Sequence, residues 1–147
     1  MVLEDMVKLN KINIMIKYLE FLYYRYYKFQ VRVGNSDIAP FSAMLIIAST
    51  IMLYYFSVFF LIILVPKDIL NFDITYFAII SLGLLVLLMI TLYFLLVYKS
   101  KYKKIINEYE KNIVSKKGIV PLLFPLIGFV LLIVSMFLKV LQNQGKI

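Results

Sequence analysis

Cysteine, histidine and tryptophan are absent from this 147-residue sequence, and these absences exclude several kinds of chemistry. Without cysteine the chain has no disulfide, no thiolate nucleophile and no thiolate metal site. Without histidine it lacks the commonest general base near neutral pH and the commonest zinc ligand. Charged residues are also scarce, at 16%, whereas hydrophobic residues make up 63%, well above the about 45–50% that is usual in soluble domains.

Charge is missing altogether from three long stretches of the sequence, Ile38–Pro66, Ile74–Tyr98 and Gly118–Leu138. Each is long enough to cross a bilayer as a helix, which takes about 20 apolar residues. We therefore expect an all-α membrane protein with three transmembrane helices over residues 41–65, 75–98 and 119–138. These spans form one membrane domain of residues 38–140, between an N-terminal segment of residues 1–37 and a short tail of residues 141–147.

The N-terminal segment predicts an amphipathic helix over residues 17–33. At 100° per residue, its four basic side chains fall within an arc of about 80°, and apolar residues line the opposite side. Such a helix suits the plane of the lipid headgroups, so we expect it to be interfacial. The alternative is an ordinary helix packed on the cytoplasmic ends of the spans.

Both ends of this helix have sequence signals. Lys8 and Lys11 do not continue the basic stripe, so a break is expected near Asn10–Asn13. Gly34 should end the helix, because glycine readily adopts the left-handed conformation of a helix C-terminus. Pro40 then suits the first turn of the first span, where its missing N–H costs little.

The positive charges predict the orientation of the spans. Six Lys or Arg residues precede the first span and seven lie in the second loop, against one in the first loop and two in the tail. In short loops, an excess of cations marks the cytoplasmic side. We expect a bacterial inner (plasma) membrane protein with a cytoplasmic N-terminus and an external C-terminus. Anionic headgroups, not nucleic acid, are the expected partners of these cations, and the candidate headgroup contacts are Lys17, Arg25, Lys28, Arg32, Lys103 and Lys104.

The second span is expected to continue as a helix into the cytoplasm. Tyr98, Tyr102, Ile105 and Tyr109 recur at helical spacing beyond its apolar end. In the third span, Pro125 lies one turn after Pro121, so its cytoplasmic half should be kinked or loosened.

Few polar or irregular positions lie within the spans, and they are candidates for contacts between helices or with a partner. They are Tyr54, Tyr55, Ser81, Pro125 and Gly128. The neighbouring residues Tyr54 and Tyr55 point about 100° apart, so we expect them to contact different helices, one of which could belong to a second protein or another copy. Gly128 should let a neighbouring helix approach.

No catalytic residue, cofactor site or metal site is predicted. The spans hold no Asp, Glu, Lys or Arg, and proton relays, coupling-ion sites and voltage sensors normally need such groups. We therefore expect no enzyme and no pump or ion-coupled carrier.

The sequence resembles a loose group of small three-span membrane proteins from Bacteroidota. The resemblance rests on the aromatic and basic block Tyr23–Lys28, the basic helix Tyr98–Lys111 and the run Lys116-Lys117-Gly118 before the last span. The group has no established activity, so the resemblance transfers no functional residue. Some similar small proteins look like immunity partners of neighbouring toxins.

Two functions fit these features. The first is a non-enzymatic accessory or interaction protein that binds another membrane component, for example as an immunity-type partner of a membrane-active toxin. The second is a self-assembling membrane effector that forms pores or disrupts the bilayer. An effector should form homo-oligomers and be toxic when overexpressed, whereas an accessory protein should co-purify with a different chain.

Overall fold

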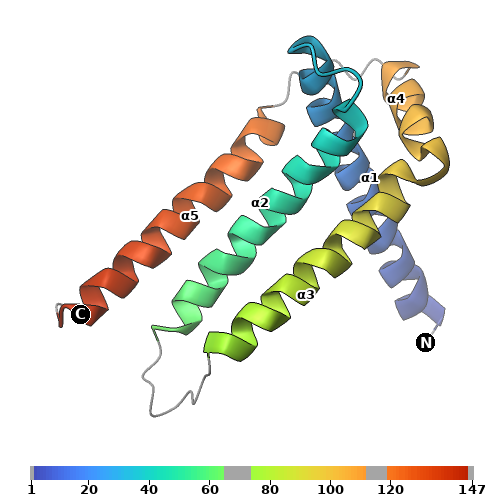
Figure 1. The fold of residues 1–147 in the computed structure, drawn as a ribbon. Coiled ribbons are helices and arrows are strands. Elements are labelled where there is room, and N and C mark those ends of the chain that lie inside the picture. Colours follow the sequence, from blue (N-terminus) through green and yellow to red (C-terminus); the bar gives the residue numbers. More distant parts are fainter. Residues whose placement is uncertain (1, 65–73, 112–118, 146–147) are drawn as a thin grey trace. The chain divides into compact units, whose positions relative to one another are not determined.

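A computed structural model describes residues 2–64, 74–111 and 119–145, and all of its regular elements are helical (Figure 1). The elements are α1 (Val2–Arg32), α2 (Ala39–Ile62), α3 (Ile74–Leu92), α4 (Lys101–Lys111) and α5 (Val120–Asn143). A π-helical turn, η1 (Tyr93–Val97), and a 3-10 turn, η2 (Tyr98–Ser100), connect α3 to α4. The predicted all-α fold with a helix before the spans is confirmed.

Three of the helical segments are long and apolar enough to cross a membrane, Ala39–Ile62, Tyr76–Lys111 and Val120–Asn143. The 24 residues of α2 or of α5 reach about 36 Å, more than the about 30 Å hydrocarbon core. A helix is also the form in which an isolated apolar segment satisfies its own backbone hydrogen bonds in lipid. The chain is an integral membrane protein.

Helix α1 is continuous, so the break expected near Asn10–Asn13 was a wrong prediction. Lys11 and Asn13 are both exposed. Polar side chains that point outward do not interrupt the helical hydrogen bonds, and the helix propensity of asparagine lowers stability by less than about 1 kcal/mol. The end of the basic stripe therefore reflects a change in which side chains face outward, while the backbone stays helical.

Gly34 ends α1 as predicted. Its φ is +91°, and the amides of Gly34 and Asn35 donate to the carbonyls of Val31 and Gln30 at 3.2 and 3.0 Å. This pair of bonds is a Schellman motif, in which a left-handed residue turns the chain away from the helix. Residues 33–38 then lead into α2, whose first turn contains Pro40.

Helical structure continues beyond the second span as expected, in α4, but a break in the helix precedes α4. Lys99 and Ser100 have φ values of 51° and 58°, and a left-handed conformation costs a non-glycine residue about 1–2 kcal/mol. The ammonium group of Lys101 donates to the carbonyl of Phe94 at 3.0 Å. This hydrogen bond connects the two sides of the break. After this turn the chain resumes a helix as α4.

In α5, Pro121 lies in the first turn and Pro125 lies inside the helix, which nevertheless runs unbroken from Val120 to Asn143. Predictions that fall on residues 65–73 and 112–118, including the predicted end of the first span at residue 65, lie outside the described residues.

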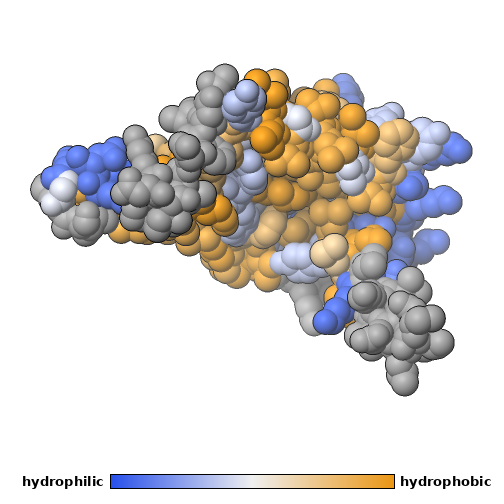
Figure 2. Space-filling view, turned by 90° about the horizontal axis from the view of Figure 1, so that it is seen from below, coloured by the Kyte–Doolittle hydropathy of each residue, from blue (hydrophilic) through white to orange (hydrophobic). Residues whose placement is uncertain are grey.

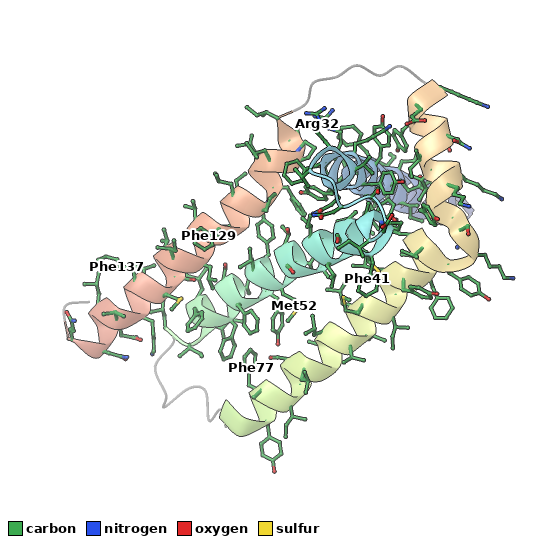
Figure 3. All side chains as sticks on the ribbon, turned by 45° about the horizontal axis from the view of Figure 1, so that its top comes forward. Arg32, Phe41, Met52, Phe77, Phe129 and Phe137 are labelled. Atoms are coloured by element: carbon green, nitrogen blue, oxygen red, sulfur yellow. The ribbon has the colours of Figure 1, made fainter. Side chains whose placement is uncertain are left out.

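The chain divides into two compact units, Met1–Leu45 with Leu92–Lys117 and Ile46–Thr91 with Gly118–Ile147. In the first unit, α1 packs on α4 and on the first turn of α2, and its core includes Leu22, Tyr23, Met44, Leu96 and Ile105. In the second unit, α2 lies between α3 and α5 (Figures 1 and 3).

The Schellman motif yields a test of the first unit. Gly34→Ala places a Cβ at a φ of +91° and should lower the free energy of unfolding by about 1 kcal/mol. Gly34→Asn should lose less, because asparagine tolerates positive φ better. Thermal unfolding of the purified protein in detergent, followed by circular dichroism, measures both; equal losses would contradict the role assigned to φ.

Candidate functional site

Tyr54 connects α2 to α5 in the second unit. Its hydroxyl donates to the carbonyl of Phe124 at 2.8 Å, and its ring lies 5.5 Å from that of Phe124. Gly128 makes the close approach possible, because a Cβ built there would lie 3.3 Å from Cε2 of Tyr54 and 3.4 Å from Cβ of Leu53. Pro125 adjoins this contact as the residue after Phe124.

Tyr55 connects α2 to α3. Its hydroxyl lies 3.2 Å from that of Ser81, and Ser81 also donates to the carbonyl of Phe77 at 2.8 Å. The rings of Phe59 and Phe77 stack at an interplanar angle of 7°, and Figure 3 shows Phe77 on α3. Tyr54 and Tyr55 thus contact different helices, and both hydroxyls have partners within this chain.

The carbonyl end of α2 has partners that the sequence did not indicate. Lys139 and Gln142 of α5 donate to the carbonyls of Ile63 and Leu64, at 3.0 and 2.6 Å. The final carbonyls of a helix lack partners within it and carry partial negative charge, so an ammonium group there is stabilising. The sequence does show a cation, Lys139, just after the third span. Its pairing with the end of α2 could not be predicted, because it requires knowing that α2 and α5 run parallel.

Hydroxyl groups on the spans mostly bond within their own helix or to a neighbour. Thr50, Ser57, Ser81 and Ser135 are buried, and each donates to a carbonyl of its own helix. Among the described side chains, no buried nitrogen or oxygen atom lacks a hydrogen-bond partner. The buried side-chain polar atoms of the second unit, as far as its residues are described, are therefore all hydrogen-bonded.

An aromatic cluster joins α1 to α4 in the first unit. The Tyr109 ring stacks on Tyr24 at 5.5 Å and lies 6.1 Å from Phe21, and its hydroxyl donates to the carbonyl of Lys17 at 2.8 Å. Tyr27 and Tyr102 lie 6.3 Å apart. The aromatic residues at helical spacing after the second span thus face the aromatic block of α1.

The candidate headgroup cations occupy different environments. Lys28 forms an ion pair with Glu110 that leaves the two side chains 44% and 43% exposed. The hydrogen bond to Glu110 raises the pKa of Lys28. Arg25 is half-buried, whereas Lys17, Arg32, Lys103 and Lys104 are exposed. The packing of α1 on α4 fits the alternative of a helix packed on the ends of the spans, and it leaves Arg32 outward.

The outer faces of the spans are apolar and uncovered. In the apolar 18-residue stretch of α2, only 22% is buried. The corresponding share is 17% in each of the segments that contain α3 and α5. Phe129 and Phe137 of α5 are 55% and 60% exposed and are labelled in Figure 3. Figure 2 shows hydrophobic side chains over most of the coloured face that it displays. Lipid or another membrane protein must cover these faces.

No metal-binding group of three or more acidic side chains occurs in the part of the chain that the structure describes. No family model, curated protein or solved structure matches the chain.

Gly128 and Gly83 provide a matched pair of tests. Both lie in spans, but a Cβ at Gly83 would meet nothing within 4 Å. Gly128→Leu should lower the unfolding free energy by about 1–3 kcal/mol through overpacking against Tyr54, whereas Gly83→Leu should leave it unchanged. Unfolding in detergent, monitored by circular dichroism, compares them; equal effects would contradict the close α2–α5 contact.

Glu20 gives a test of the contact between α1 and α4. Burial, and next the carboxylate of Glu108, raise the pKa of Glu20 above its usual 4.5. A carboxyl group with a raised pKa binds its proton more tightly in the folded state, so its contribution to stability falls as pH rises from about 4.5 through the raised pKa.

Glu20→Gln should therefore stabilise the protein at pH 7, by about 0.5 kcal/mol or less because the site is partly solvated. It should also reduce the loss of stability between pH 4.5 and pH 7. Unfolding midpoints of the variant and the unmodified protein at both pH values measure this. A variant that is less stable at pH 7 would contradict the assigned desolvation.

Proposed function

We propose that this chain is a non-enzymatic accessory protein of a bacterial inner membrane, which acts by binding another membrane component. An immunity-type partner of a membrane-active toxin is the form of this function that we favour. The choice of membrane rests on the short basic loops and on the resemblance to three-span proteins of Bacteroidota.

One observation carries the proposal: the buried polar side chains of the spans are hydrogen-bonded within the chain, while the outer faces are largely apolar. Tyr54 and Tyr55 bond to α5 and α3, and the buried hydroxyls bond to backbone carbonyls. Chemistry on a substrate needs accessible acids, bases or metal ligands, whereas recognition of a membrane protein needs shape and apolar area. Only the second kind of surface is available on the described spans.

The proposed orientation places the N-terminus and α4 in the cytoplasm and the C-terminus outside. Thirteen of the 16 cations, counted over the whole sequence, then lie on the cytoplasmic side. In this orientation the basic surfaces of α1 and α4 adjoin anionic headgroups, which attract each nearby cation by about 1 kcal/mol.

The alternative is a self-assembling effector that forms pores. A pore needs a polar stripe along at least one span, because water must replace lipid there. Thr91 is exposed, but its hydroxyl donates to the carbonyl of Leu87, and most other exposed side chains in the middle of α3 and α5 are aliphatic or aromatic. This composition favours an interaction protein over a pore.

Native mass spectrometry of the protein in mild detergent, after expression with its genomic neighbours, tests the proposal. We expect a monomer or small assembly that carries a different polypeptide at fixed stoichiometry, and no toxicity on overexpression of the chain alone. A homo-oligomer of four or more copies, together with toxicity, would contradict the proposal and support the effector.

A further inference from the structure

The C-terminal half of α1 carries a cleft next to the aromatic cluster, and the two share Tyr24. Its volume is about 550 Å³, and it is lined by Tyr24, Arg25, Lys28, Phe29, Val31 and Arg32. Arg32 is labelled in Figure 3, near the end of α1. The described residues of the lining combine three cations with two aromatic rings and include no carboxylate.

The charge of the cleft favours an anion. Arg25, Lys28 and Arg32 follow one another at spacings of three and four residues, so they lie on one side of the helix. Glu110 partly neutralises Lys28, whereas Arg32 is exposed. A guanidinium group presents its donors in a plane that matches two oxygens of a phosphate, so an arginine at this cleft suits a phosphate better than a lysine would.

The depth of the cleft in the membrane follows from Tyr23. This side chain is fully buried, and its hydroxyl donates to the carbonyl of Pro40 at 3.0 Å. Pro40 lies in the first turn of a membrane-spanning helix, and the end of a helix long enough to cross the hydrocarbon core lies near the headgroups. Tyr24 and Arg25 follow Tyr23 directly, so the cleft lies at the same level.

Apolar residues around the cleft distinguish a lipid from a soluble anion. Phe29 is 56% exposed, and at 100° per residue it shares a side of α1 with Val33, which is also exposed. Exposed apolar side chains at headgroup depth are stable when acyl chains cover them. A soluble phosphate would leave these side chains in water.

We propose that the cleft formed by Arg25, Lys28 and Arg32 is a discrete binding site for the phosphate headgroup of an anionic phospholipid. The adjoining face around Phe29 contacts the acyl chains of that lipid. This inference deepens the proposed placement of the basic surfaces against headgroups and rests on that placement, but it requires no protein partner.

The test compares Arg32→Gln with Lys103→Gln in the full-length protein. Both positions are exposed and each change removes one positive charge, but only Arg32 lines the cleft. Retention of phosphatidylglycerol is measured by native mass spectrometry during delipidation, with phosphatidylcholine as the neutral probe. Arg32→Gln should lower phosphatidylglycerol retention about tenfold, as expected for a lost charge-assisted hydrogen bond, and Lys103→Gln by less than about twofold.

Equal losses in the two variants, or no loss in Arg32→Gln, would overturn the discrete site in favour of diffuse attraction. Equal retention of phosphatidylcholine would also overturn it, because the site is assigned to an anionic lipid. Displacement of the lipid by millimolar inorganic phosphate would show a site for free phosphate instead. Arg32→Lys keeps the charge and should recover part of the binding; partner capture tests the proposed function separately.

Discussion

Polar groups in the hydrocarbon of a bilayer have no water to bond to, so they need partners inside the protein. In this chain, two tyrosine hydroxyls of α2 find such partners on the neighbouring helices α5 and α3. Tyr54 donates to a carbonyl of α5, and Tyr55 shares a hydrogen bond with Ser81 of α3. Since consecutive residues of a helix point about 100° apart, two adjacent tyrosines are enough to fix helices on two sides of α2. Gly128 then decides how closely α5 approaches.

This arrangement determines which surfaces remain for recognition. Because α2 bonds to both neighbours, α3 and α5 present their other sides outward, and those sides are largely apolar. The basic residues concentrate instead in the first unit, where α1 and α4 pack through their aromatic side chains. The protein thus has two chemically different surfaces: an apolar one within the spans and a cationic, aromatic one beside the first turn of α2.

The membrane-spanning helices and the end of α1 could be predicted from the sequence because each has a local cause. A long stretch without charge predicts a span, and Gly34 predicts a helix end whether or not the rest of the fold is known. The left-handed turn at Lys99 and Ser100 has no such signal, because neither residue type favours positive φ. The hydrogen bond from Lys101 to the carbonyl of Phe94 spans this turn, and it exists only once the chain has folded.

In the candidate site too, features set by local helix geometry could be predicted, and contacts between distant residues could not. The separate directions of Tyr54 and Tyr55 follow from helix geometry, but their partners do not. The ion pair of Lys28 with Glu110 joins residues 82 positions apart, and the contact of Lys139 with the end of α2 joins residues 76 apart. Such pairs depend on helix packing, which the composition of an apolar segment leaves open.

The orientation of the spans underlies both proposals, and the absence of cysteine makes it directly measurable. Single variants Asn143→Cys and Lys103→Cys place one thiol at each proposed side of the membrane, at exposed positions. A membrane-impermeant maleimide should label Asn143→Cys in cells whose inner membrane is intact, and Lys103→Cys only after that membrane is permeabilised. The reverse labelling pattern would contradict the account.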